Sequence, residues 1–180
     1  SNLIIMMWSD THLSPKLSGL IKRKALMIKI NVISNNILWR KYIRNPKLFI
    51  NGKINLINKK NTLYKKNIFN CTLLLSGAKE IKELNKKFRN KNKSTDILSF
   101  PFYERKNLIR IIKNEKKIYL GDIIINLDKV KNKTNNRLFR EQLNRLWIHG
   151  LLHLFGYTHK KNREFLTMQK LENKFFNALK

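Results

Sequence analysis

Cysteine, acidic residues and long apolar runs are scarce in this sequence of 180 residues. The one cysteine, Cys71, cannot form an internal disulfide, and its place in the run CTLLL is typical of a small buried side chain. This cysteine usage favours a reducing cytoplasm. No stretch approaches the roughly 20 apolar residues of a membrane-spanning helix. We therefore predict a soluble, cytoplasmic protein with no membrane partner.

Acidic residues are far outnumbered by basic ones. The chain has 11 aspartates and glutamates against 39 lysines and arginines, which gives a formal net charge of +28. An excess of this size is typical of proteins that bind nucleic acid or an anionic membrane surface. Lysine, asparagine and isoleucine are abundant together, as in proteins encoded by AT-rich genes, so coding bias accounts for part of the charge. We predict that the charge also serves RNA binding through phosphate neutralisation.

One folded domain is predicted over residues 27–180, because a chain of this length can bury an adequate core without disulfides. Residues 1–26 are predicted to be a poorly ordered N-terminal extension. Their apolar piece LIIMMW has no preceding basic region and is followed by Asp10, which argues against a secretory signal. His12 also lies in this extension, where we expect an incidental, exposed histidine.

Strands are predicted mainly in the first two thirds of the chain. They are expected from Met27 (MIKINVI), in NCTLLLSG, in STDILSFPFYE, where Pro101 favours a sheet edge, and in YLGDIIINL. Between them we predict a short helix in NNILWRKYIRN that ends before Pro46, a helix in AKEIKELNKKFRN and a hairpin-like insertion around NLIRIIKNEKKIYL. The segment KLFINGKINLINKKNTLYKKN fits no element clearly.

The last third of the chain is predicted to be helical, in RLFREQLNRLWIHGLLHLFG and REFLTMQKLENKFFNAL. On the final helix, Met168, Leu171 and Phe175 recur at helical spacing, so we expect them in the core. Strands before helices, with one strand-helix-strand crossover, predict an α+β single domain with a small mixed β-sheet covered by helices.

Three of the four histidines lie in the segment HGLLHLFGYTH, residues 149–159. His149 and His153 are four residues apart, so on a helix they project from the same face. Gly156 allows the chain to leave the helix, and His159 can then fold back as a third ligand. Three neutral imidazoles suit one zinc ion and leave its fourth position open, as in catalytic zinc sites. The sequence therefore predicts a metal site on a C-terminal helix and the following turn.

The residue after the first histidine argues against proteolysis. Zincin proteases carry a glutamate at this position as general base on the metal-bound water, whereas this chain has Gly150. A zincin-like metalloprotease is kept as an alternative, but peptide hydrolysis by the usual mechanism is not expected.

Three blocks of the sequence together resemble the YbeY family of bacterial metal-dependent endoribonucleases. They are LNKKFRNKNKSTDILSFPF at 84–102, YLGDIIINLDKV at 119–130 and HGLLHLFGYTH at 149–159. The resemblance implies a single-strand-specific endoribonuclease that acts in 3′ end maturation of 16S ribosomal RNA and in ribosome quality control. It also implies ribosomal RNA and the ribosome or ribosomal proteins as partners. A non-catalytic ribosome assembly factor is the other alternative; the oligomeric state is not predicted.

The resemblance implies roles for individual residues. His149, His153 and His159 would bind one zinc ion, and His149 would be catalytic. Arg89 would match the family's functional arginine, and its planar guanidinium suits bidentate binding of phosphate. The family usually reads GYDH where this chain reads GYTH, so Thr158 replaces an aspartate; a threonine can form hydrogen bonds but carries no negative charge.

Further polar and aromatic residues are weaker candidates. Three carboxylates lie beside apolar runs and could orient a ligand histidine, namely Asp96, Asp122 and Glu141. For the first, a local turn with Ser94 and Thr95 is an equal alternative, and the last could instead pair with a lysine. Four aromatic residues could stack on RNA bases, although the first of them is expected in the core: Phe100, Phe102, Tyr103 and Tyr157.

Overall fold

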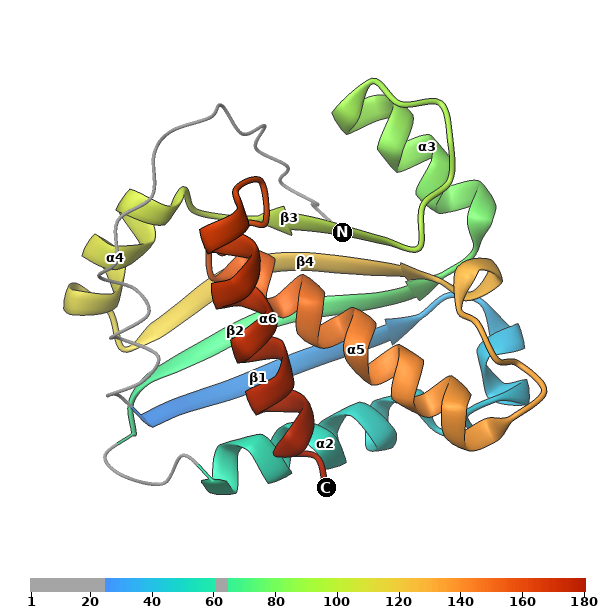
Figure 1. Cartoon of the computed structure of the whole chain (residues 1–180), viewed down its shortest axis with the longest axis horizontal. Coiled ribbons are helices and arrows are strands. Elements are labelled where there is room, and N and C mark those ends of the chain that lie inside the picture. Colours follow the sequence, from blue (N-terminus) through green and yellow to red (C-terminus); the bar gives the residue numbers. More distant parts are fainter. Residues whose placement is uncertain (1–24, 61–64) are drawn as a thin grey trace.

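A four-stranded mixed β-sheet lies at the centre of the molecule (Figure 1), in the order β1-β2-β4-β3. The computed structural model describes residues 25–60 and 65–180. Three strands are parallel and the fourth runs antiparallel at one edge: β1 (Ala25–Ser34), β2 (Lys65–Ser76), β4 (Lys117–Asn126) and β3 (Ile97–Pro101). Pro101 ends the edge strand, as predicted, because proline has no N–H to donate to a neighbouring strand.

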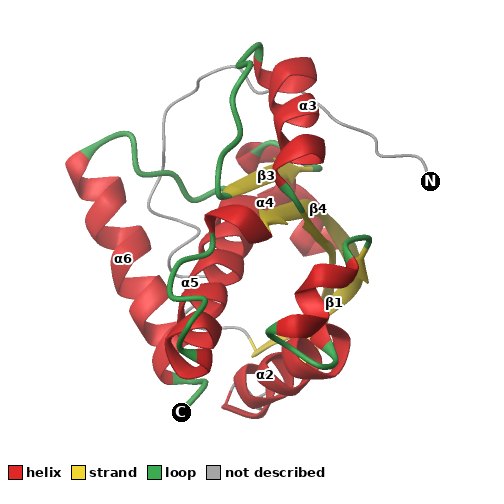
Figure 2. Cartoon of the chain, turned by 90° about the vertical axis from the view of Figure 1, so that its right-hand side faces the viewer, coloured by secondary structure: helices red, strands yellow, loops and turns green. Residues whose placement is uncertain are grey.

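Helices cover both faces of this sheet. In the described part of the chain they are η1 (Ile37–Lys41), α2 (Pro46–Lys60), α3 (Ala78–Arg89), α4 (Arg105–Asn114), η2 (Leu127–Lys129), α5 (Asn136–Leu154) and α6 (Asn162–Asn177). α5 packs on β3 and β4, α2 packs on β1, and α6 lies against α5 on the side away from the sheet (Figure 2). α3 packs on β3 and β4 from the opposite face. The predicted α+β single domain is therefore confirmed.

α5 is held firmly in the core. Its residues Phe139, Leu143, Trp147 and Leu151 recur every four residues and are fully buried, so one face of the helix is continuous with the core. Each such side chain stabilises the fold by roughly 1.5–3 kcal/mol relative to leaving it exposed. The expected core positions of the last helix, Met168, Leu171 and Phe175, are also buried, as is Cys71. The backbone of α5 is therefore held in a fixed position, and with it the side chains that α5 carries.

β1 is the other edge strand, and a side chain from α2 occupies part of its free edge. The Asn58 amide nitrogen donates to the Ile28 carbonyl at 2.8 Å, and the Ile28 N–H donates to Asn58 Oδ1 at 2.9 Å. Asn58 thus makes the two hydrogen bonds that a neighbouring strand would make at this residue.

Two segments differ from their predictions. The expected hairpin-like insertion is wrong, because its first part forms the helix α4 and its second part begins β4. Leu108 and Ile112 are both buried, and their spacing of four residues places them on one face of a helix. The segment without a predicted element contains α2, in which Ile50, Ile54 and Ile57 are buried at helical spacing.

The start of the chain is only partly described. The first strand begins at Ala25, two residues before the predicted Met27, and the predicted short helix is the 3-10 helix η1. Residues 1–24, with His12, lie outside the described residues, so the N-terminal extension stays a prediction. Among the described helices, none combines the length and apolar character that a membrane span requires.

Candidate metal centre

Three histidines meet where α5 ends. His149 and His153 project from successive turns of α5, and His159 comes from the loop before α6. One ring nitrogen of each lies within 4.8 Å of the other two, which is close enough for all three to hold one metal ion. The first two side chains are half-buried and the third is exposed. The structure therefore brings together the three predicted ligands.

The turn after α5 carries His159 back toward the helix. α5 ends at Leu154, and Gly156 has φ +80°, a left-handed conformation that favours glycine. Its N–H donates to the His153 carbonyl at 2.8 Å. Arg105 from α4 fastens this turn, because its guanidinium donates to the Gly156 carbonyl at 3.2 Å and lies over the Tyr157 ring. The predicted role of Gly156 in turning the chain is confirmed.

Hydrogen bonds at Nδ1 orient two of the three rings. His149 Nδ1 lies 2.6 Å from a carboxylate oxygen of Glu172, and His153 Nδ1 lies 2.8 Å from the Tyr157 carbonyl oxygen. Carboxylate and carbonyl oxygens only accept, so in each neutral imidazole the proton sits on Nδ1. Nε2 of each ring therefore presents a lone pair.

These two lone pairs face one another. The Nε2 atoms of His149 and His153 are 2.9 Å apart, and when both rings are neutral neither Nε2 carries a proton to donate. Two acceptors at this distance repel unless a cation lies between or beside them. A metal ion bound through both Nε2 atoms removes the conflict, and His159 can supply the third nitrogen. The donor set thus fits a zinc-type ion held by neutral imidazoles.

The pKa of His153 favours metal binding and gives a testable pH dependence. Burial, followed by the neighbouring His149, lowers it from 6.5 to about 4, although the bond to the Tyr157 carbonyl opposes the shift. His153 is therefore neutral at pH 7. Between pH 6.5 and pH 4 the unfolded chain binds a proton here that the folded chain does not, so the metal-free protein should lose stability as the pH falls. In an NMR titration of that protein we expect His153 to titrate near pH 4; a midpoint above 6 would contradict this description.

Glu172 is the site residue that the sequence prediction missed. The three proposed carboxylates have other hydrogen-bond partners than the ligand histidines: Asp96 accepts from the Thr95 hydroxyl and the Ile97 N–H, Asp122 accepts from Tyr119, and Glu141 pairs with Arg137. The proposed pairing of Glu141 with a lysine was also wrong. A signal was present, since only Glu164 and Glu172 of the 11 acidic residues follow the third histidine.

Replacing Glu172 with glutamine should weaken the metal site without unfolding the protein. The amide keeps the size of the side chain but carries no charge to orient the Nδ1 proton of His149. Loss of such a partner typically costs about 10- to 100-fold in metal affinity, which a competition titration with a chromophoric chelator would measure. Glu141→Gln is the matched control, because it removes a carboxylate from the same domain far from the histidines, at a pair with Arg137. Equal affinities in both variants would contradict the assignment.

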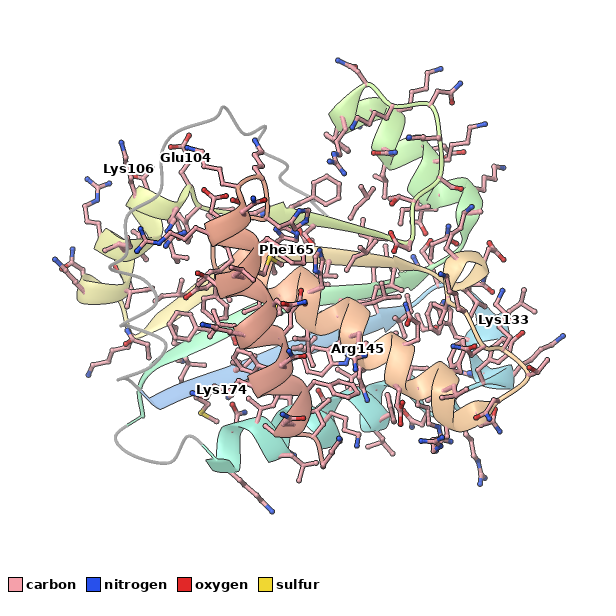
Figure 3. The ribbon with its side chains drawn as sticks, in the orientation of Figure 1. Glu104, Lys106, Lys133, Arg145, Phe165 and Lys174 are labelled. Atoms are coloured by element: carbon pink, nitrogen blue, oxygen red, sulfur yellow. The ribbon has the colours of Figure 1, made fainter. Side chains whose placement is uncertain are left out.

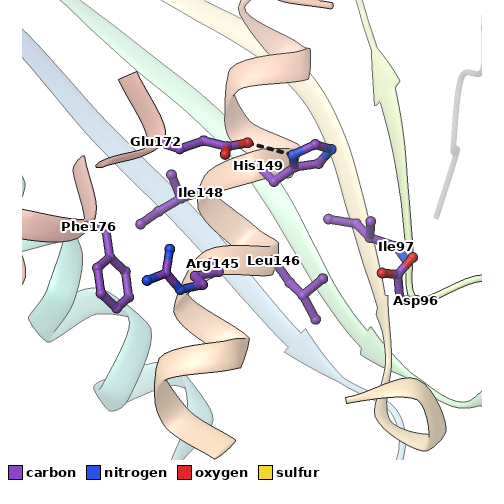
Figure 4. A pocket seen from close by; sticks show the side chains of 8 residues that line it. All are labelled: Asp96, Ile97, Arg145, Leu146, Ile148, His149, Glu172 and Phe176. Atoms are coloured by element: carbon purple, nitrogen blue, oxygen red, sulfur yellow. Dashed lines mark hydrogen bonds and ion pairs between the residues drawn. The ribbon is translucent and has the colours of Figure 1, made fainter. Parts of the chain in front are cut away.

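A small cavity adjoins His149 (Figure 4). Its volume is about 250 Å³, and its polar lining includes Asp96, Arg145 and Glu172. The apolar lining comes from β3, α5 and α6, and it includes Ile97, Ile148 and Phe176. The Arg145 guanidinium lies 4.1 Å from the centre of the Phe176 ring. The histidine cluster is therefore reached from this cavity at His149.

The sequence profile of the family described as Endoribonuclease YbeY matches residues 41–180. A protein from Pelagibacter ubique named endoribonuclease YbeY is 42% identical over 156 residues, which cover 86% of this chain and 97% of that protein. The chain belongs to the YbeY family. A Wolbachia endoribonuclease YbeY is 32% identical over 157 residues, or 85% of this chain and 95% of that protein. A solution structure from Thermotoga maritima covers 85% of this chain and 89% of its own, at 25% identity and a TM-score of 0.48.

Gly150 separates this member of the YbeY family from the zincin proteases on steric grounds. A Cβ atom at this position would lie 2.8 Å from a methyl carbon of Ile123, 2.9 Å from Ile97 Cδ1 and 3.1 Å from Ser99 Oγ. The helix therefore packs on β3 and β4 through a position without a side chain. A glutamate here would point into the sheet and not at the metal, so the proteolytic alternative has no support in the structure.

The residue that departs from the YbeY motif has its own carboxylate partner. The Thr158 hydroxyl donates to a carboxylate oxygen of Glu164, which lies in the first turn of α6. Glu164 lies six residues further along the chain, so a carboxylate adjoins Thr158. Thr158 thereby also links the loop that carries His159 to α6.

Arg89 lies at the C-terminal end of α3 and is exposed. No hydrogen bond or ion pair between described residues connects it with the three histidines, and α3 packs on the sheet face opposite to α5. Its phosphate-binding role stays a prediction.

The aromatic candidates differ in accessibility. Tyr157 and Phe100 are buried, which was expected only for Phe100, so neither ring can stack on a base. Phe102 and Tyr103 are half-buried and contact each other, and they remain candidates.

Proposed function

We propose that this chain is a metal-dependent endoribonuclease that hydrolyses single-stranded RNA, with ribosomal RNA as its substrate in the cytoplasm. Its proposed task is the 3′ end maturation of 16S ribosomal RNA and ribosome quality control. The observation that carries the metal dependence is the convergence of three histidine ring nitrogens, with the Nε2 atoms of His149 and His153 2.9 Å apart. Membership of a family whose curated members are named endoribonucleases supports the reaction.

His149, His153 and His159 would hold one zinc ion, which would supply Lewis acidity and lower the pKa of a bound water. The chain's own residues prepare this site. Glu172 and the Tyr157 carbonyl keep the Nδ1 protons in place, so that both Nε2 atoms face the same point. Arg105 fixes the turn that provides the Tyr157 carbonyl. Asp96 and Arg145 line the adjoining cavity, where an RNA segment would lie beside His149.

The charge of the surface supports a polyanionic substrate. Cationic side chains project outward from several elements, including Lys106, Lys133 and Lys174 (Figure 3). Such side chains bind phosphates and release counterions, so RNA affinity should fall steeply as salt rises. Ribosomal RNA and the surrounding ribosomal proteins are accordingly the proposed partners.

Arg89→Gln should reduce RNA cleavage while leaving the bound metal in place. The guanidinium would contact the phosphate backbone, and loss of a charge-assisted contact costs about 1.5–3 kcal/mol, or roughly 10- to 100-fold in kcat/KM. Lys82→Gln is the matched control, because it removes an exposed cation from the same helix. Cleavage kinetics on a single-stranded oligonucleotide, with metal quantified in parallel, give the measurement. Equal rates in the two variants would contradict the assigned role of Arg89.

The decisive experiment compares substrates with and without chelator. Purified protein is assayed for zinc and then incubated with single-stranded RNA, duplex RNA and an unfolded protein. We expect about one metal equivalent per chain and chelator-sensitive cleavage of single-stranded RNA alone. Chelator-sensitive proteolysis without RNA cleavage would instead support the protease. Bound RNA that is not cleaved by the metal-loaded protein would support the non-catalytic assembly factor.

A further inference from the structure

The connection between β1 and α2 places apolar side chains in solvent. Ile37 in η1 and Leu48 in α2 are 73% and 70% exposed, and Leu38 and Ile33 are 44% and 40% exposed. Isolated exposed apolar residues are ordinary on soluble proteins, whereas a group of them indicates a contact surface. These four residues lie within 16 positions of one another in the sequence.

A cavity of about 430 Å³ opens in the same connection. Its lining includes the apolar residues Val32 and Ile37 and the cations Arg40, Arg44 and Lys47. We call Ile37, Arg40, Arg44, Lys47 and Leu48 the η1–α2 surface. This surface consists of three exposed cations and two exposed aliphatic side chains, of which all but Leu48 line the cavity.

The positive charge of this surface is uncompensated. The sequence has no aspartate or glutamate from residue 25 to residue 79, and no ion pair within the described ranges involves Arg40, Arg44 or Lys47. Three cations around one cavity without a carboxylate attract an anionic partner and disfavour a cationic one.

The segment that carries the η1–α2 surface is well anchored. Trp39 is fully buried, and its indole N–H donates to the Ser76 carbonyl at 3.0 Å. Asn36 accepts from the Leu38 N–H, and Asn45 accepts from the Leu48 N–H, so both helix starts are capped. The exposed side chains are therefore presented by a defined backbone, and binding need not order a loop.

This surface and the metal centre lie at opposite ends of α5. Trp39 packs edge-on against Phe139 near the start of α5, with ring centres 6.2 Å apart. His149 is ten residues further along, which corresponds to about 15 Å of helix. A partner on the η1–α2 surface would leave the histidines accessible.

We propose that the η1–α2 surface binds a protein segment that presents apolar side chains flanked by carboxylates. The carboxylates would meet Arg40 and Arg44, and the apolar side chains would cover Ile37 and Leu48. RNA would satisfy only the cations, because bases stack on aromatic rings and the exposed large side chains here are aliphatic. A second copy of this chain would bring the same cations to the interface, and like charges would repel.

The test uses two probes with the full chain. One is a synthetic peptide with two leucines among glutamates, and the other is a single-stranded RNA oligonucleotide. Binding is followed by fluorescence anisotropy and by amide shifts of the ¹⁵N-labelled protein. Two double variants separate the halves of the surface: Ile37→Ser with Leu48→Ser, and Arg40→Gln with Arg44→Gln. Leu56→Ser is the matched control, because Leu56 is an exposed leucine of the same helix, α2, outside the η1–α2 surface.

We expect the peptide to shift the amides of Ile37 and Leu48 and to bind at least about tenfold more weakly to each double variant. The peptide affinity of the Leu56→Ser control should stay within about twofold of that of the unchanged protein. The same holds for the RNA affinity of the serine double variant. Three results would overturn the proposal: no peptide binding at about 1 mM, peptide binding that is insensitive to the serine variant, or RNA that shifts these amides instead. Because all sites involved lie away from the histidines, zinc content and RNA cleavage report separately on the proposed enzyme.

Discussion

Replacing His153 with alanine should reduce RNA cleavage by at least roughly 1,000-fold, beyond the 10- to 100-fold typical of residues that only orient a ligand. His153 provides one of the two facing Nε2 atoms, and its Nδ1–H donates a hydrogen bond to the Tyr157 carbonyl. Its loss leaves His149 and His159 as the only histidine nitrogens of the cluster. Two imidazoles from separate segments retain zinc poorly, so the zinc content should fall from about one equivalent to near zero.

The control for this variant is His12→Ala, which removes the only histidine outside the cluster. It should keep both the zinc and the cleavage activity. Circular dichroism and thermal unfolding establish that the His153 variant is folded, since its half-buried side chain supports the turn at Gly156. Cleavage that survives in a folded, zinc-free His153 variant would show that the histidine cluster does not catalyse the reaction.

Replacing Gly150 with glutamate should prevent folding at ordinary temperature and create no protease. The new side chain would begin 2.8–2.9 Å from carbon atoms of Ile123 and Ile97, and its carboxylate would be buried against the sheet without a partner. Overpacking together with an unpaired buried charge costs more than about 4 kcal/mol, which is a large part of the stability of a small domain. Urea unfolding and the yield of soluble protein provide the measurement.

Gly150→Ala separates the effect of overpacking from the effect of a buried charge. Alanine favours the helix by about 1 kcal/mol over glycine, but its methyl group meets the same two isoleucines. Overpacking of this kind costs about 1–3 kcal/mol, so we expect a net loss of roughly 1 kcal/mol and retained zinc binding. A glutamate variant as stable as the alanine variant, with caseinolytic activity, would show that α5 can move away from the sheet and that the protease mechanism is available.

Local spacing explains why the sequence predicted the histidine cluster. His149 and His153 are one helical turn apart within a strongly apolar helix, and the glycine that turns the chain lies three residues later. All of that information is contained in 11 consecutive residues. Glu172 lies 23 residues from its partner His149, and their contact depends on how α6 packs against α5. Spacing along one helix does not determine the packing of two.

The two errors in secondary structure have a related cause. The run around Leu108 is rich in isoleucine, a residue whose intrinsic preference is for strands. From the sequence alone, the side chains that pack against this run are unknown. In the folded chain Leu108 and Ile112 are buried on one helix face, and this packing determines the helix. α2 has buried isoleucines at helical spacing, but asparagines and Gly52 lower its intrinsic helix propensity. In both segments tertiary packing outweighed the local preference.

The hydrogen bonds between Asn58 and Ile28 bear on the solubility of this protein during folding. An uncovered edge strand can recruit strands from other chains and start aggregation. In β1, alternating isoleucine and valine residues face the core, which is the pattern of a strand prone to such pairing. Asn58 satisfies both backbone groups of Ile28 and thus closes the edge at that residue. Asn58→Ala should therefore increase the aggregation rate of the refolding chain. The three histidines should be unaffected, because α5 packs on β3 and β4 at the opposite edge of the sheet.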